Sequence, residues 1–265
     1  MRRLFTFGCS NTKYVWPTWA NIVGLNYDSH LNFGKPGAGN YYIQCRLNEV
    51  NQFYGITKDD CVMVMVSSFS RHDFIDNDSN WRCHGNIYTN DVFDFNFIDK
   101  YWSLEYGLTV TWNAVENIIK TLNEIGCEYK IMKSFDLSMV EVSPPTVNDK
   151  LNDVRKISSK VKYIERRLNE ILPYENLFDF SQNKYGNFSK TNMYDFDDYP
   201  YKDNHPTIDG HLQWVKIYMP EYYRPEMDSM VRNWETLISK NRKSTADNFV
   251  HIDDEFDIFN PPSPK

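Results

Sequence analysis

Two polar segments near opposite ends of the 265-residue chain contain the residue types that nucleophilic catalysis requires. Ser10 lies in residues 7–12, directly after an apolar run, where a hydroxyl and a free backbone amide could face a substrate. Asp203 and His205 lie just before Pro206, so a carboxylate and an imidazole could share one loop. A serine hydroxyl needs a base to take its proton, and that base needs an acceptor to hold its tautomer. The three residue types together indicate Ser-His-Asp chemistry.

Each of these residues also has a plainer interpretation. Ser10 could cap a following helix, which is a common use of serine. Cys9 could be the nucleophile instead, although a cysteine beside an apolar strand more often packs as a small hydrophobe. His205 could be a solvated loop residue, and His211 is a second candidate base that could equally pack or cap a helix.

A glycine-rich segment, residues 32–40, follows the second apolar run. Its three glycines let the backbone approach a ligand closely and aim amides at it. The spacing matches neither a phosphate-binding P-loop nor a dinucleotide-binding loop. Asn40 ends the segment, where it could cap a helix.

A metal site is not predicted. His72, Cys83 and His84 lie close together in the sequence but lack the spacing of a complete ligand set. No other cofactor is indicated. The surrounding residues 68–106, and residues 193–201, are rich in aromatic side chains, which can stack on sugar rings or acyl groups or fill the core.

Apolar runs predict alternating strands and helices. The strand candidates are residues 4–8, 25–33, 61–67 and 128–135, with a weaker fifth at 176–180. Helical spacing of apolar residues covers residues 39–53, 110–125 and 154–172. The alternation predicts a mainly parallel five-stranded sheet between two helical layers, an α/β/α fold. Ligands bind such sheets beyond the carboxyl ends of the strands, where the segments containing Ser10 and the three glycines belong.

The domain organisation follows from the extent of this pattern. Residues 1–218 are predicted to form one domain, with long loop insertions at residues 68–106 and 181–204. Residues 219–265 are predicted to be a C-terminal extension, helical at first and then an acidic tail.

Composition limits the class of protein. The chain has 29 basic and 36 acidic residues, a formal charge of −7, which disfavours a nucleic-acid partner. No run approaches the roughly 20 apolar residues of a membrane span, and the apolar start is too short for a signal peptide. Five scattered cysteines favour reduced thiols inside a cell. Asparagine (27) far outnumbers alanine (4), which indicates an AT-rich bacterial or viral genome. A cytoplasmic protein is expected, or a virion-associated one if the chain is viral.

The polar segments taken together resemble the SGNH hydrolases, also called GDSL-type, over residues 4–217. The resemblance implies a flavodoxin-like fold and hydrolysis of an acyl or acetyl ester on a carbohydrate or lipid-like substrate. It implies that Ser10 is the nucleophile, His205 the general base and Asp203 the carboxylate that orients the base. The amides of Ser10 and Gly37 would form part of the oxyanion hole.

Two of the motifs differ from the family pattern. The family's usual Gly-Asp-Ser is Gly-Cys-Ser here. The family more often places two residues between the Asp and the His, whereas only Asn204 separates Asp203 from His205. Asp198 or Asp209 could therefore take the place of Asp203.

The block after the third strand differs most. The family has Gly-x-Asn-Asp there, and its Asn side chain completes the oxyanion hole, but residues 66–73 contain no Asn. Ser68, Ser70 or Arg71 could supply the donor instead, and a guanidinium is a strong one. Loss of such a donor typically costs about 2.7–4 kcal/mol of transition-state stabilisation.

Asn40, Arg71 and Tyr201 are predicted to bind the substrate, an ester-bearing small molecule or glycan. A second hypothesis belongs to another class of protein. The missing Asn and the long aromatic loops are also typical of a weak or inactive SGNH fold, used as a binding or structural module in a virion or polysaccharide assembly.

Overall fold

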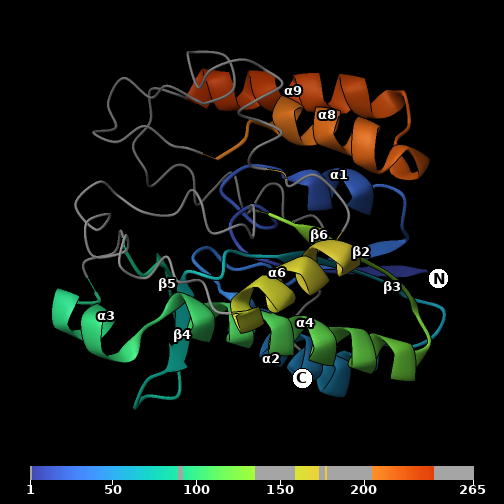
Figure 1. Ribbon diagram of the computed structural model, residues 1–265. Helices are drawn as coiled ribbons and strands as arrows, with labels where there is room; N and C mark the ends of the chain where they lie inside the picture. The colour runs from blue at the N-terminus through green and yellow to red at the C-terminus, as the bar shows by residue number, and fades with distance from the viewer. Residues whose placement is uncertain (1, 89–91, 135–158, 173–176, 178–204, 242–265) are drawn as a thin grey trace.

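The computed structural model describes residues 2–88, 92–134, 159–172, 177 and 205–241. Its central sheet has four parallel strands in the order β2-β1-β3-β6 (Figure 1). These strands are β1 (Arg3–Phe7), β2 (Ser29–Asn32), β3 (Cys61–Val66) and β6 (Glu128–Lys133). A parallel sheet in which the first strand lies between the second and third is flavodoxin-like, and ligands bind such sheets at the β1/β3 switch point.

Helices cover both faces of the sheet (Figure 1). One face carries α1 (Trp19–Gly24), α8 (Ile208–Tyr218) and α9 (Glu226–Asn241), with the short 3-10 turn η1 (Pro220–Tyr222) between the last two. The other face carries α2 (Asn40–Tyr54), α4 (Leu104–Ile125) and α6 (Ser159–Ile171). The predicted three-layer α/β/α fold is confirmed.

The sheet has a hydrophobic core on each face, which explains why the sequence of β3 is a continuous apolar run. Its three valines pack with α2 and α4, whereas Cys61, Met63 and Met65 pack with α1 and α8. All six residues are at most 1% exposed, because a central parallel strand has no solvent-facing side.

Two predictions about the elements need correction. Residues 68–106 do not form a long irregular loop: β4 (Arg71–Ile75) and β5 (Trp81–Asn86) pair as an antiparallel hairpin, and α3 (Phe95–Tyr101) follows. The Asp76 carboxylate closes the hairpin turn by accepting the amides of Asp78 and Asn80. Within the described part of the chain the main sheet has four strands, not five. Of the predicted fifth strand only Leu177 is described, and it is helical and buried.

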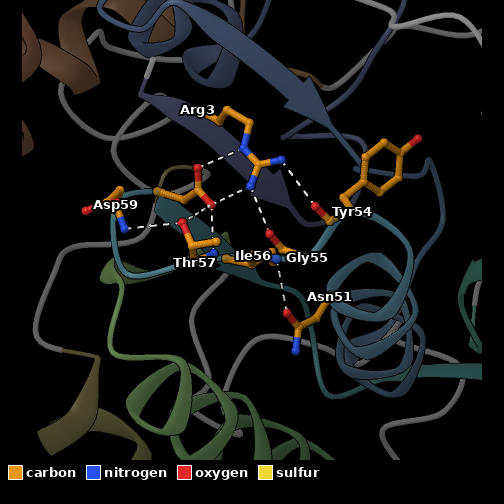
Figure 2. A network of polar contacts seen from close by, with 8 residues as sticks. Arg3, Asn51, Tyr54, Gly55, Ile56, Thr57 and Asp59 are labelled. Atoms are coloured by element: carbon orange, nitrogen blue, oxygen red, sulfur yellow. Dashed lines mark hydrogen bonds and ion pairs between the residues drawn. The ribbon is translucent and has the colours of Figure 1, made fainter.

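A partly buried ion pair joins segments at the amino-terminal edge of the sheet (Figure 2). The Arg3 guanidinium donates Nε and Nη2 to the two carboxylate oxygens of Asp60, at 2.8 and 2.7 Å. It also donates to the carbonyls of Tyr54 and Gly55, at 3.2 and 2.9 Å. Thr57 adds two more hydrogen bonds to the Asp60 carboxylate. The start of β1 is thereby joined to the end of α2 and the start of β3.

The first part of the predicted C-terminal extension, residues 219–241, packs against the predicted domain. Met227 and Val231 of α9 are buried in the same cluster as α8, while the tail and the predicted insertion at residues 181–204 lie outside the described residues. The boundary at residue 218 stays a prediction.

All five cysteines are free thiols. Among the described helices, none combines the length and apolarity needed to cross a membrane.

Candidate active site

Ser10 lies in a tight turn at the carboxyl end of β1. The amides of Thr12 and Lys13 both donate to the Cys9 carbonyl, at 2.9 and 3.1 Å, so the chain folds back directly after the strand. Gly8 permits this turn, because a Cβ there would lie 2.0 Å from the Thr12 hydroxyl. The next helix, α1, begins at Trp19 with Thr18 as its N-cap, so the interpretation of Ser10 as a helix cap is wrong.

The glycine segment forms a second turn at the end of β2. The Ala38 amide donates to the Lys35 carbonyl at 3.0 Å, with Pro36 and Gly37 at the two central positions and Gly37 at φ +78. This pattern is typical of a type II turn, which favours glycine at its third position. The Lys35 amide donates to the Gly8 carbonyl at 3.0 Å, which joins this turn to the Ser10 turn. The amides of Ser10 and Gly37 have no hydrogen-bond partner among the described residues.

Replacement of Gly37 by alanine is expected to destabilise the protein by at least about 2 kcal/mol. The backbone is left-handed there, and the new Cβ would lie 2.3 Å from the Cys83 carbonyl oxygen. Gly126 is the matched control, since it has φ +74 but nothing within 4 Å of a built Cβ. Gly126→Ala should lower the free energy of unfolding by only about 1 kcal/mol. Urea unfolding measures both, and equal losses would show that Cys83 does not crowd the turn.

Asn40 holds the end of β3 against α2. Its side-chain oxygen accepts the Ser67 amide at 2.7 Å, and its amide nitrogen donates to the Ser67 carbonyl and the Thr111 hydroxyl. It is not the cap of α2, whose N-cap residue is Gly39. Both donor hydrogens of Asn40 are therefore used inside the protein, where they hold the β3 loop, and its predicted contact with the substrate stays a prediction.

The β3 loop contains the candidates for the missing oxyanion donor. Ser68 and Ser70 share a hydrogen bond of 2.7 Å between their hydroxyls, and both are buried. Arg71 starts β4 and donates Nη1 to the Ala38 carbonyl at 2.9 Å, which places its guanidinium against the glycine turn. Of the three candidates, Arg71 is the one whose charge reaches the Ser10 turn.

The electrostatics of Cys9 show that reach. Burial opposes ionisation of the Cys9 thiol, but the Arg71 charge and neighbouring polar groups, among them the Ser134 hydroxyl at 3.6 Å, hold its pKa below the ordinary value. Cys9 is fully buried in the core, as expected for a small hydrophobe.

The sequence reasoning missed Asp73. Its carboxylate accepts the amides of Gly39 and Tyr42, at 2.8 and 3.0 Å, and so caps α2 from the neighbouring hairpin. Burial raises the pKa of this carboxyl despite these hydrogen bonds. A signal was present, because an N-cap glycine has no side chain of its own and leaves helix amides to be satisfied by another element.

His205 lies against the Ser10 loop, although 195 positions separate the two residues in the sequence. Its imidazole stacks on the Tyr14 ring, with centroids 3.9 Å apart and planes 22° apart. Next to it, the indole of Trp16 donates Nε1 to the Pro206 carbonyl at 3.0 Å. Thr207 then caps α8 by accepting the Gly210 amide at 3.1 Å. The segments that contain the predicted nucleophile and the predicted base therefore meet at one edge of the sheet.

His211 is less suited to act as the base. It is 1% exposed on α8, and burial, with a smaller contribution from the charge of His205, lowers its pKa to about 3. General bases work best with a pKa near the operating pH. His211 therefore packs as a neutral ring behind the His205 loop.

The predicted acid of the triad lies outside the described residues. The same holds for Asp198 and for Tyr201, so the roles of Asp203, Asp198 and Tyr201 stay predictions. The remaining alternative, Asp209, is exposed at the start of α8, where its carboxylate accepts the Gln213 side chain.

An aromatic cluster fills the space between the hairpin, α3 and the start of α4. His72 lies at its centre, with ring centroids 5.6–6.3 Å from those of its neighbours. These neighbours are Phe74, Phe93, Phe97, Trp102 and Tyr106, and His84 contacts Phe74 and Phe93. In the part of the chain that the structure covers, no three His, Cys, Asp or Glu side chains come together as metal ligands.

Four segments thus converge at the carboxyl edge of a flavodoxin-like sheet: the turns after β1 and β2, the loop after β3 and the loop before α8. This is the fold class that the SGNH resemblance implies. No model of a known protein family matches the sequence, and no curated protein matches it.

Several solved structures are similar to the chain, and two of them are described here. One is a member of the lipolytic G-D-S-L family from Veillonella parvula, with 12% identity and a TM-score of 0.41, covering 83% of this chain and 99% of that one. The other is the YxiM protein of Bacillus subtilis, with 13% identity and a TM-score of 0.31, covering 58% of this chain and 42% of that one. Since both TM-scores are below 0.5, the fold class rests on the strand order and the helical layers described above.

Proposed function

We propose that the chain is a serine hydrolase that cleaves an ester through Ser10, His205 and an acidic residue, Asp203. The observation that carries the proposal is the contact between the His205 loop and the Ser10 loop, through Tyr14 and Trp16. Both loops lie at the edge where ligands bind parallel sheets of this strand order.

The proposed chemistry has two steps. The Ser10 hydroxyl attacks the carbonyl carbon while His205 takes its proton, and collapse of the tetrahedral intermediate releases the alcohol, which receives that proton. Water then attacks the acyl-enzyme, with His205 again as base, and the carboxylic acid leaves. The amides of Ser10 and Gly37 and the Arg71 guanidinium are the proposed oxyanion donors, with the Ser68 hydroxyl as the alternative to Arg71.

The proposed substrate is an acyl or acetyl ester of a carbohydrate or of a lipid-like alcohol. Arg71 and Tyr201 are its proposed contacts, and no cofactor is required for this chemistry. The cytoplasmic location, the viral origin and the virion association stay predictions.

Labelling of the nucleophile tests this function. The full chain is incubated with p-nitrophenyl acetate and, separately, with a fluorophosphonate, and the labelled peptide is identified by mass spectrometry. We expect ester hydrolysis and a single phosphonate adduct on Ser10. A sample pretreated with iodoacetamide controls for cysteine reactivity. A chain that neither hydrolyses the ester nor accepts the phosphonate would support the alternative, a binding or structural module with this fold.

Arg71→Met is expected to lower kcat for p-nitrophenyl acetate by about 10²- to 10³-fold, the usual cost of removing one oxyanion donor. The kcat of Arg71→Lys should fall between those of the wild type and Arg71→Met, because lysine keeps the charge but not the forked donor geometry. Arg82 on β5 is the matched control: its side chain is 48% exposed and pairs with Asp76, so Arg82→Met should leave kcat nearly unchanged. An Arg71→Met protein with full activity would transfer the donor role to Ser68.

A further inference from the structure

The loop that follows the nucleophile also holds the base. We infer that Tyr14 and Trp16 are the positioning residues of His205, Tyr14 by fixing the plane of the imidazole and Trp16 by fixing the backbone that carries it. This inference rests on the proposed function and adds to it two aromatic residues that hold the general base in place.

The Tyr14 contact is made face to face. The two ring centroids are 3.9 Å apart and the planes differ by only 22°. A ring stacked on its face resists rotation out of that plane, while its two nitrogens lie on the ring edge, outside the stacked face. The stack therefore opposes rotation of the imidazole about its Cβ–Cγ bond, which would move these nitrogens away from their proposed partners.

The same contact favours the charged state that the reaction creates. His205 becomes an imidazolium when it takes the Ser10 proton, and an aromatic face attracts a cation in contact with it. A contact that is stronger for the imidazolium than for the neutral ring stabilises the transition state more than the ground state. Loss of the ring should therefore appear in kcat rather than in KM.

Trp16 secures the backbone at the next residue. It is 2% exposed, and its indole donates to the Pro206 carbonyl at 3.0 Å. It also supports Tyr14, since the two rings meet edge to face with centroids 4.6 Å apart. Pro206 limits the torsions of the His205 loop, and Thr207 anchors the loop to α8.

The Ser10 turn and the two aromatic residues are parts of one anchored loop. The Thr12 carbonyl accepts the Thr18 hydroxyl at 2.6 Å and the Asn32 side chain at 2.8 Å. Ser10 lies before this anchor, and Tyr14 and Trp16 lie after it. The same hydrogen bonds at the Thr12 carbonyl therefore fix both Ser10 and the two rings that position His205.

Two tyrosine variants separate the ring from the hydroxyl. Tyr14→Leu should lower kcat for p-nitrophenyl acetate by about 10- to 100-fold with KM within about threefold of wild type, because small misplacements of a catalytic group have effects of this size. Tyr14→Phe keeps the stacked ring and should retain kcat within about threefold. Tyr163→Leu on α6 removes an exposed tyrosine from the far helical layer and should change neither constant.

A second readout does not depend on activity. In protein with ¹³C-labelled histidine, the ring protons of His205 should carry the ring-current shift of a stacked tyrosine, assigned with His205→Gln. The shift should persist in Tyr14→Phe and in Trp16→Phe, and disappear in Tyr14→Leu. Trp16→Phe keeps an aromatic ring but loses the donor to Pro206, so we expect its kcat to fall roughly tenfold.

The outcomes are distinguishable. Wild-type kcat in Tyr14→Leu, or an equal loss in Tyr14→Phe, would overturn the positioning role while leaving the serine hydrolase intact. An inactive wild-type chain, or a Ser10→Ala variant with full activity, would instead overturn the proposed function. If Tyr14→Leu does not fold, Trp16→Phe decides the matter, because unchanged kcat in that variant contradicts the inference.

Discussion

Ser10→Ala is expected to lower kcat for ester hydrolysis by about 10⁴-fold or more, since removing the nucleophile of a catalytic triad leaves only binding and the oxyanion donors to act. The same variant should lose the phosphonate adduct. Its fold should be unchanged, because Ser10 makes no side-chain hydrogen bond to a described residue. Ser229→Ala on α9 is the control, since Ser229 is exposed and far from the Ser10 turn in the sequence.

The neighbouring cysteine is the direct competitor of Ser10. Arg71 and the surrounding donors lower the pKa of the Cys9 thiol, but the thiol is fully buried, so a substrate cannot reach it. Cys9→Ala should therefore retain kcat within about tenfold, with a modest loss of stability from the lost packing. Activity that survives in Ser10→Ala and disappears in Cys9→Ala would reverse the assignment.

Asp60→Asn is expected to reduce the free energy of unfolding by about 2–4 kcal/mol, because it leaves the partly buried Arg3 guanidinium without its counter-charge. The carboxylate of Asp60 is 3% exposed and accepts four hydrogen bonds from Arg3 and Thr57 (Figure 2). Asp59→Asn, one residue earlier and exposed, should change stability by less than about 0.5 kcal/mol. Urea unfolding at pH 7 compares the two.

The Asp60 contribution also has a defined pH dependence. Burial opposes ionisation of Asp60, but the hydrogen bonds from Arg3 and Thr57 outweigh it and hold the pKa of this carboxyl below its usual range. The folded state therefore binds this proton less tightly than the unfolded state does. The stabilisation is complete above the unfolded pKa of about 3.9 and is lost as the pH falls through the folded pKa. The difference between wild type and Asp60→Asn should shrink below about pH 4, and a difference that stays constant with pH would contradict the ion-pair explanation.

Strands β1 and β3 could be predicted from the sequence because each is a short apolar run that the sheet buries. Strand β6 could be predicted from Tyr129, Ile131 and Met132, although charged residues lie between and beside them. The prediction for β2 was too long, since residues 25–28 follow α1 and only Ser29–Asn32 pairs with β1. The hairpin of β4 and β5 was missed because its residues alternate weakly and mix charged, aromatic and amide side chains. Its stability comes from the turn at Asp76 and from packing against the glycine turn, which are contacts between segments.

The order of strands and helices, the glycines that allow the turns, and the choice of Ser10 and His205 as candidates all follow from the sequence, because they depend on local periodicity and residue type. The tertiary structure alone decided that Tyr14 faces His205, that Asp73 caps α2, that Arg71 reaches the glycine turn and that Asn40 braces β3. Such contacts depend on the distance and angle between elements that are far apart in the chain. Residue type and spacing limit these contacts but cannot specify them, since packing of the two cores sets how the elements lie against the sheet.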